Sequence, residues 1–228
     1  LVTPVPSAIT ASLMEGLRND VVCQNFAIRQ AVPFEPIGYR EALVRAMDRE
    51  EQDQVRTRWS DAYPPAHELA IKLKEMRKQP RYTASYGLKT EKPAQDLFRA
   101  ACRIGGTEGW FHSNWLWRLR GFLDRLLGGV GTLRGRKRAQ SLQVGDVIDF
   151  WRVEELVPDQ RLLLRAEMLL PGRAWLEFRI EDQQIDRILQ IRAYYHSRSI
   201  FGKLYWYVLV PLHRFVFRDL IRGIEEKA

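Results

Sequence analysis

Residues 161–180 read Arg-Leu-Leu-Leu-Arg-Ala-Glu-Met-Leu-Leu-Pro-Gly-Arg-Ala-Trp-Leu-Glu-Phe-Arg-Ile, which is two strand patterns on either side of a Pro-Gly turn signal. Every second residue is apolar in each half, from Leu162 to Met168 and from Ala174 to Ile180. Because side chains alternate between the two faces of a strand, this spacing predicts an antiparallel hairpin with one buried face.

The buried face also limits how the two strands can pair. A two-residue loop would set apolar side chains against polar ones, whereas a three-residue loop sets Ala166 opposite Leu176 and Arg165 opposite Glu177. We therefore predict a three-residue loop that ends at Gly172 in the left-handed conformation. The same register predicts an ion pair between Arg165 and Glu177 on the other face.

The flanking sequence extends this hairpin into a larger sheet and a long helix. Further strands are predicted over 82–90, 147–156 and 185–196, and helices over 94–103, 110–127 and 199–224. Ser199 stands where an N-cap belongs, and Pro211 is expected to kink or divide the last helix, which is largely apolar. A sheet with one apolar face and an apolar helix can bury each other's surfaces. The predicted class is α+β, with a curved antiparallel sheet that grips the C-terminal helix.

The first 80 residues have a different character. Helix patterns over 7–17 and 40–49 occur in about fifty residues that contain no predicted sheet, too few for an independent core. The following stretch is charged and is broken by Pro64 and Pro65, as in a linker. The predicted organisation is a domain remnant over 1–50, a linker over 51–80 and the main domain over 81–228.

The composition bounds the class of protein. The chain has 228 residues, 46% of them hydrophobic, and a formal net charge of +8. Its two cysteines, Cys23 and Cys102, form no Cys-x-x-Cys pair, which argues against a disulfide scaffold or a cysteine zinc site. The longest apolar run, 204–212, is far shorter than the roughly 20 residues of a membrane-spanning helix. We expect a cytoplasmic protein without a transmembrane segment.

Several motifs resemble those of a known family. They are residues 109–123 (Gly-Trp-Phe-His-Ser-Asn-Trp-Leu-Trp-Arg-Leu-Arg-Gly-Phe-Leu), 128–131 (Gly-Gly-Val-Gly), 149–154 (Asp-Phe-Trp-Arg-Val-Glu) and 171–177 (Pro-Gly-Arg-Ala-Trp-Leu-Glu). Over residues 82–224 the chain resembles a bacterial domain of unknown function that follows atypical short-chain dehydrogenase/reductase domains, which are NAD(P)-binding and epimerase-like. The order of elements also resembles the helix-grip fold of the START and Bet v 1-like (SRPBCC) superfamily.

The resemblance has consequences for cofactors and partners. Residues 1–49 resemble the C-terminal end of such a reductase domain, so it implies NAD(P) for the missing N-terminal domain and that domain as a partner in cis. These 228 residues contain neither a glycine-rich turn between a first strand and a helix nor a Tyr-x-x-x-Lys motif. We therefore expect no NAD(P) binding and no redox step from this fragment.

Members of the helix-grip superfamily commonly bind apolar ligands between sheet and helix. The leading hypothesis is therefore an accessory domain that binds an apolar or amphipathic small molecule. The residues expected to line the cavity are Trp110, Trp115, Trp117, Phe150, Leu164, Ala166, Leu176, Phe178, Leu204, Tyr207, Val208 and Phe215. Aromatic residues at this density also fit a solid core.

Other hypotheses remain open beside this one. One is a structural domain with a filled core, which only docks on a partner or forms a homodimer. Another is a hydrolase or lyase that uses His112 or His196, although no catalytic residue is assigned and the histidine spacing suggests no metal site. The basic segment after the Gly-Gly-Val-Gly run offers a weak anion site at Arg134 and Arg136. Glu154 and Glu155, directly after an aromatic strand, argue against nucleic acid.

Overall fold

The computed structural model describes residues 7–19, 27–32, 34–51, 71–76, 80–106, 108–129, 131–132, 136, 142–182 and 186–228. The chain divides into two compact units, Leu1–Arg56 and Thr57–Ala228. In the first unit the described segments are helices α1 (Ser7–Gly16), α2 (Ala27–Ala31) and α3 (Tyr39–Glu51). Most of their described side chains are exposed.

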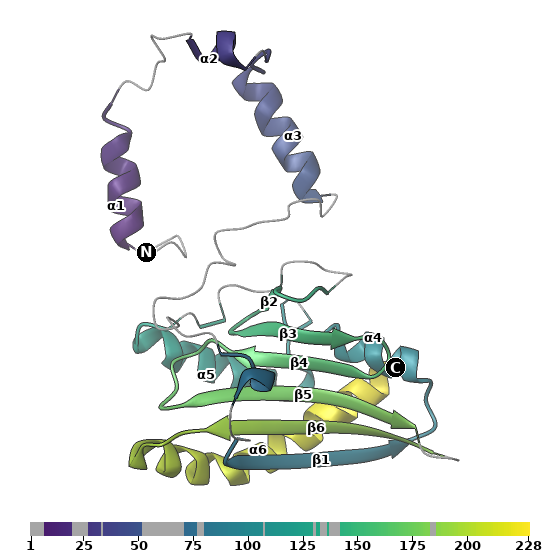
Figure 1. Ribbon diagram of the computed structural model, residues 1–228. Helices are drawn as coiled ribbons and strands as arrows, with labels where there is room; N and C mark the ends of the chain where they lie inside the picture. The colour runs from purple at the N-terminus through teal and green to yellow at the C-terminus, as the bar shows by residue number, and fades with distance from the viewer. Residues whose placement is uncertain are drawn as a thin grey trace. The chain divides into compact units, whose positions relative to one another are not determined.

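The second unit is built on a six-stranded, curved antiparallel sheet (Figure 1). Its strands are β1 (Tyr82–Thr90), β2 (Val147–Ile148), β3 (Trp151–Val157), β4 (Arg161–Ala166), β5 (Arg173–Asp182) and β6 (Arg187–His196). Their spatial order is β1-β6-β5-β4-β3-β2, so the first strand of the sequence pairs with the last. The class is therefore α+β, as predicted.

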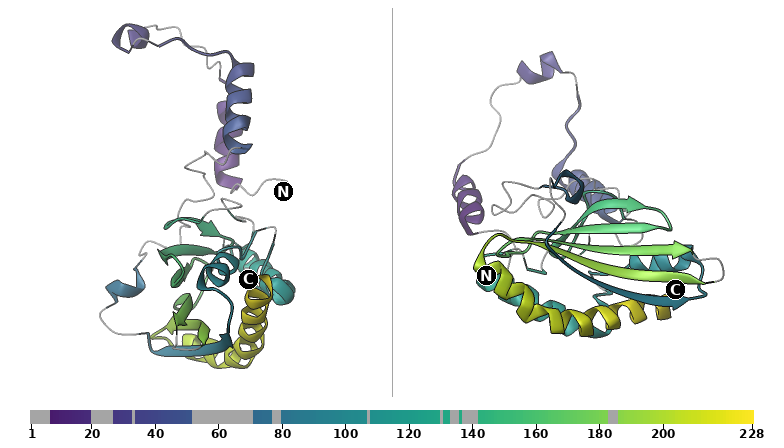
Figure 2. Two further views of the ribbon diagram at one scale, coloured as in Figure 1. Left: turned by 90° about the vertical axis from the view of Figure 1, so that its right-hand side faces the viewer. Right: turned by 60° about the horizontal axis from the view of Figure 1, so that its bottom comes forward.

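Helices cover one face of this sheet (Figure 2). They are α4 (Ala94–Ala101), α5 (Asn114–Leu126), which follows the short 3-10 turn η3 (Phe111–Ser113), and the long α6 (Ile200–Lys227). A second short turn, η2 (Leu73–Glu75), lies before β1. Between sheet and helices lies the core, in which Leu164, Leu176 and Leu220 are fully buried.

The hairpin β4–β5 has the predicted faces but a different register. Leu162 pairs with Phe178 and Leu164 with Leu176, so the pairing is shifted by two residues from the predicted one. The connection spans 167–172, and Gly172 is not among the residues with positive φ. Arg165 lies opposite Trp175 instead of Glu177. A shift of two residues keeps every side chain on its own face, so the face pattern alone could not exclude it.

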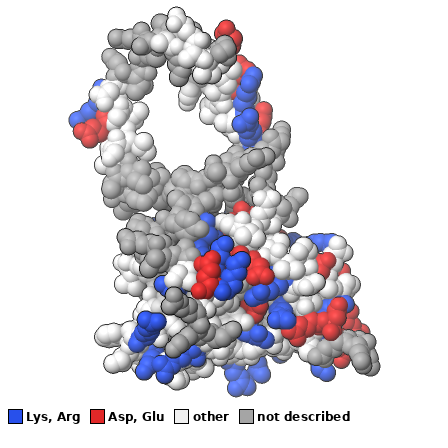
Figure 3. Space-filling model, viewed as in Figure 1, with Lys and Arg blue, Asp and Glu red and all other residues white. Residues whose placement is uncertain are grey.

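The other face of the sheet carries a network of charged side chains. Glu177, 1% exposed, accepts hydrogen bonds from Arg161 Nε at 2.5 Å and from the Tyr194 hydroxyl at 2.7 Å. Glu154 accepts from the indole N–H of Trp175 at 3.0 Å and from the backbone N–H of Leu73 in η2. Figure 3 shows Lys, Arg, Asp and Glu interspersed in this view. Charges of both signs therefore offset each other within this face.

Helix α6 begins as predicted, since the Ser199 side chain accepts a hydrogen bond from the Gly202 N–H at 3.0 Å. Pro211 lies inside the helix and does not divide it, because α6 continues to Lys227. The predicted strand over 147–156 is interrupted at Asp149, whose φ of 52° forms a tight turn between β2 and β3. Within the described residues, no helix has the length and apolar character needed to span a bilayer.

Candidate functional site: an apolar cavity between sheet and helix

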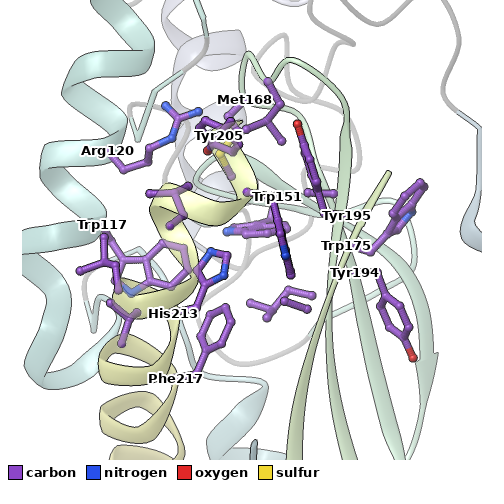
Figure 4. Close-up of a pocket in the computed structure, with 18 of the residues that line it drawn as sticks. Trp117, Arg120, Trp151, Met168, Trp175, Tyr194, Tyr195, Tyr205, His213 and Phe217 are labelled. Carbon is purple, nitrogen blue, oxygen red and sulfur yellow. The ribbon is translucent and has the colours of Figure 1, made fainter. Parts of the chain in front are cut away.

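A partly open cavity of about 130 Å³ lies between the inner face of the sheet and helices α5 and α6 (Figure 4). Most of the surface that lines it is apolar. The lining residues are Leu116, Trp117, Arg120, Trp151, Met168, Leu170, Ala174, Trp175, Leu176, Ala193, Tyr194, Tyr195, Tyr205, Trp206, Leu209, Leu212, His213, Val216 and Phe217.

The sheet supplies its part of the lining through strand alternation. Leu176 and Ala193 are paired across β5 and β6 on the inner face, and Tyr195 follows two residues later on the same face. Figure 4 shows the side chains of Trp175 and Tyr194 beyond these strands, on the side away from His213. The β5 and β6 side chains that point toward the helices thus come from the even positions of β5 and the odd positions of β6.

Helix α6 supplies the opposite wall through a stripe at helical spacing. Trp206, Leu209, His213, Val216 and Phe217 lie three, four or one positions apart and face the sheet. His213 packs between Trp206 and Phe217, with ring centroids 5.3 and 5.0 Å away. The imidazole is therefore held among aromatic rings.

Burial makes the cavity electrically neutral around His213. It lowers the pKa of His213 from 6.5 to about 4, so this side chain is uncharged at neutral pH. Burial also raises the pKa of Tyr195 to about 12, which keeps its hydroxyl protonated. Among the described residues, His213 Nδ1 and the indole nitrogens of Trp117 and Trp151 have no hydrogen-bond partner. A group enclosed here meets no full charge from these side chains.

Arg120 is a charged residue in the lining, and its guanidinium is engaged. Nη2 donates to the Leu169 carbonyl at 2.9 Å, and Nη1 lies 3.5 Å from the fully buried carboxylate of Asp124. These contacts tie α5 to the connection between β4 and β5. Arg120 therefore helps to hold the cavity wall in place.

Of the residues expected in a cavity, Trp117 and Leu176 line this one. Five others are buried in the surrounding core, namely Trp110, Phe150, Leu164, Ala166 and Phe178. Trp110 stacks on Trp117 with centroids 4.2 Å apart, so it supports the lining from behind. Five more are exposed by 61–65%, namely Trp115, Leu204, Tyr207, Val208 and Phe215.

The exposed residues correct the predicted orientation of α6. The prediction turned Leu204, Val208 and Phe215 toward the sheet, whereas the structure turns the stripe through Trp206 and His213 inward. The helix is apolar on both sides, so hydrophobicity alone did not distinguish them. Gly202 and Gly223 indicate which side of α6 is buried, because only glycine fits there. A Cβ on Gly202 would lie 1.9 Å from Ser197, and a Cβ on Gly223 would lie 2.7 Å from Phe111.

The remaining candidates lie elsewhere. His112 is exposed and lies 3.6 Å from Asp219 and from Glu226. His196 is not part of the cavity lining, and burial lowers its pKa. Within the described part of the chain, no three His, Cys, Asp or Glu side chains are grouped as metal ligands would be.

The predicted anion site consisted of Arg134 and Arg136. Arg134 lies outside the described residues. Arg136 donates from Nη1 to the carbonyls of Cys102 and, at 3.3 Å, of Ile104, and burial lowers its pKa. Its guanidinium therefore holds the chain after α4.

Comparisons with known proteins give a family but no activity. No curated protein matches the chain. Solved structures that are similar include protein MLL2253 from Mesorhizobium loti (10% identity, TM-score 0.36, 64% of this chain and 99% of that one). Another is protein CV1439 from Chromobacterium violaceum (14% identity, TM-score 0.33, 62% and 94%). A third is CalU16 from Micromonospora echinospora (11% identity, TM-score 0.29, 64% and 82%).

The profile of one protein family matches residues 77–220, which include the whole sheet and most of α6. This chain therefore belongs to the family described as "Protein of unknown function (DUF2867)".

Proposed function

We propose that the domain over residues 81–228 binds an apolar or amphipathic small molecule in the cavity between the sheet and α6. The single observation that carries this proposal is the partly open, aromatic-lined cavity. The arrangement of sheet and C-terminal helix also fits a helix-grip, START/Bet v 1-like domain, which we propose as its class.

The size of the cavity limits what it can enclose. Ligand pockets are commonly about 300–1,000 Å³, whereas apolar cavities of roughly 150 Å³ accept a molecule the size of benzene. At about 130 Å³, this cavity would enclose a single ring or a short alkyl chain. Any larger part of the ligand would project through the opening, and the enclosed part would be uncharged because His213 is neutral.

The direct test is a titration of the protein with benzene and with heptanoate, followed by NMR of the indole N–H signals. We expect the signals of Trp117 and Trp151 to shift saturably. The variant Ala193→Leu fills the cavity wall and should abolish the shifts, while Thr83→Leu, an exposed position on β1, should leave them unchanged. The proposal is wrong if neither probe shifts either indole signal.

The natural ligand requires a second experiment. Native mass spectrometry of the protein purified from its own cells should reveal a bound small molecule, which Ala193→Leu should lose. Absence of any added mass in the wild-type protein would argue for a docking domain instead. That second candidate is favoured by one observation, the exposed apolar side chains on α5 and α6.

The remaining proposal concerns the first unit. We propose that residues 1–50 are the end of an NAD(P)-binding reductase-like domain, which the ligand-binding domain would serve in the intact protein. Its support is the sequence resemblance of that segment. Calorimetric titration with NADH and NADPH should show no binding by the 228 residues and binding by the longer protein. Binding by the 228 residues alone would contradict it.

A further inference from the structure

The outward side of α6 is apolar over its first four turns. Phe201, Leu204, Val208 and Phe215 lie on this side, and each is 61–79% exposed. They follow one another at spacings of three, four and seven residues, so they form one stripe along the helix. The stripe faces away from the sheet, because the cavity-lining residues occupy the other side.

Helix α5 adds a second apolar surface on the same side of the sheet (Figure 2). Trp115, Phe122 and Leu126 are 56–67% exposed and lie one or two turns apart. Both helices line the cavity with their inner sides, and these apolar residues lie outside that lining. Together they expose more large apolar side chains than scattered surface residues would explain.

Three arginines follow the apolar stripe in the C-terminal half of α6. Arg214, Arg218 and Arg222 are spaced one turn apart, are all exposed, and line a shallow hollow with Pro211 and Phe215. None of the three forms an ion pair with a described residue. Like charges at this spacing destabilise a helix. An anionic group outside the protein would offset that repulsion.

The acid in the hollow does not neutralise these arginines. Asp219 accepts a hydrogen bond from the Ser113 hydroxyl and lies 3.6 Å from His112. Its carboxylate is therefore directed toward η3.

From these observations we propose that the outward side of α5 and α6 docks on the surface of an anionic lipid bilayer. Apolar and aromatic side chains would enter the boundary between headgroups and acyl chains, where Trp and Tyr are favoured. The arginines would bind lipid phosphates, to which a guanidinium donates paired hydrogen bonds. This proposal does not depend on a ligand in the cavity.

Charge favours a bilayer over a second copy of the chain. A two-fold symmetric interface brings the same patch of both copies together. Such an interface would gather the arginines of both copies, three from each, into one patch, and their like charges would repel. An anionic bilayer satisfies both the apolar stripe and the arginines at once.

The test uses co-sedimentation of the whole chain with lipid vesicles. We expect binding to vesicles of equal parts phosphatidylglycerol and phosphatidylcholine, weak binding to phosphatidylcholine alone, and a decrease with added salt. The triple variant Arg214→Gln, Arg218→Gln, Arg222→Gln should bind roughly a hundredfold more weakly. A matched control, Lys74→Gln, Lys89→Gln, Arg179→Gln, removes three charges away from this side and should bind like the wild type.

A second variant tests the apolar part. Leu204→Ser with Val208→Ser should weaken vesicle binding while the circular dichroism spectrum and the benzene titration stay unchanged, since both positions are exposed. Failure of the wild type to bind the anionic vesicles would overturn the proposal and favour an acidic protein as the occupant. Equal loss in the control variant would also overturn it, as would a wild-type dimer that this second variant converts to a monomer.

Discussion

The side chain of Asp124 accepts a hydrogen bond from the backbone N–H of Gly131, with 2.8 Å between Oδ2 and N. Its other oxygen accepts from the Leu169 N–H at 2.7 Å, and its backbone carbonyl accepts from the Gly129 N–H at 2.8 Å. One fully buried carboxylate thus joins the end of α5, the glycine-rich turn and the β4–β5 connection. This accounts for the glycines structurally, since a Cβ on Gly129 would lie 2.3 Å from Oδ2 of Asp124.

Replacing this carboxylate should destabilise the fold. In Asp124→Asn one of the two oxygens becomes an NH2 group, which would face a backbone N–H donor. Hydrogen bonds to a charged group contribute about 1.5–3 kcal/mol each, so we expect the free energy of unfolding to fall by about 2–3 kcal/mol. Urea denaturation measures this loss. The control Asp96→Asn, at a half-buried position, loses an ion pair with Arg99 and should change stability by less than about 1 kcal/mol.

A second buried carboxylate, Glu167, should contribute as much to the free energy of unfolding. The carboxylate of Glu167 accepts hydrogen bonds from Arg152, at 2.5 Å from Nε and at 3.2 Å from Nη2. Both side chains are at least nine-tenths buried. Glu167→Gln removes the charge of a buried carboxylate that faces both Arg152 and Arg165, and breaking a buried ion pair typically costs about 3–5 kcal/mol. Thermal unfolding should show this loss, and Glu181→Gln at the exposed pair with Arg179 should not. Equal effects of the two changes would contradict the argument.

The sequence was sufficient to predict the faces of β4 and β5, but not their register. Alternation places Leu164 and Leu176 on one face, and both the predicted and the actual register respect it. The actual register depends on partners far away in the chain, because the connecting residues bind Phe150, Asp124 and Ser197 through backbone and side-chain hydrogen bonds. Local patterns carry no information about such contacts.

The same connection gives Gly172 a role that a substitution can test. A Cβ at this position would lie 2.6 Å from the His196 carbonyl, and φ there is not positive. Gly172→Ala should therefore destabilise the domain through a backbone clash, by about 1–3 kcal/mol. Gly128→Ala, where φ is 85° and nothing lies within 4 Å, should cost about 1–2 kcal/mol from backbone strain alone. The two mechanisms can be separated by Gly→Asn, because Asn tolerates positive φ and should rescue position 128 only.

The candidate site was less predictable than the fold. Trp117 and Leu176 were found because one lies in an aromatic motif and the other on a clear strand face. His213 and Trp206 were missed because α6 is apolar on two sides. Gly202 and Gly223 lie on the side of α6 that packs closely against other elements. They identify the buried side by its lack of space for a side chain, not by its hydrophobicity.

The orientation of α6 predicts a sharp contrast between its two sides. Leu220→Ala removes a fully buried side chain and should lower the free energy of unfolding by about 2–5 kcal/mol. Phe215→Ala, at a side chain that is 61% exposed, should change it by no more than about 0.5 kcal/mol. Urea denaturation of both variants checks this. A larger loss from Phe215→Ala than from Leu220→Ala would mean that the helix faces the other way.

The pH dependence of stability should reveal two buried groups that act in opposite directions. Burial raises the pKa of Asp149 from 3.8 to about 6, although its carboxylate accepts the Trp110 indole N–H at 2.7 Å. As the pH rises from about 4 to 6, the unfolded chain loses this proton first, so the contribution of Asp149 to stability falls. His213, whose pKa is lowered to about 4, is protonated in the unfolded chain but neutral in the fold. Its contribution therefore rises with pH between about 4 and 6.5.

These opposite slopes should largely cancel in the wild-type protein, and single substitutions should separate them. Asp149→Asn removes the opposing Asp149 contribution, so the free energy of unfolding should increase more steeply from pH 4 to pH 6.5 than in the wild type, with His213 contributing at most about 1.4 kcal/mol per pH unit. His213→Phe removes the opposing His213 contribution, so stability should decrease with pH over the same interval relative to the wild type. Urea denaturation at half-unit steps of pH measures both slopes. A slope in either variant equal to that of the wild type would contradict this expectation, because the substituted side chain would then contribute nothing to the pH dependence of stability.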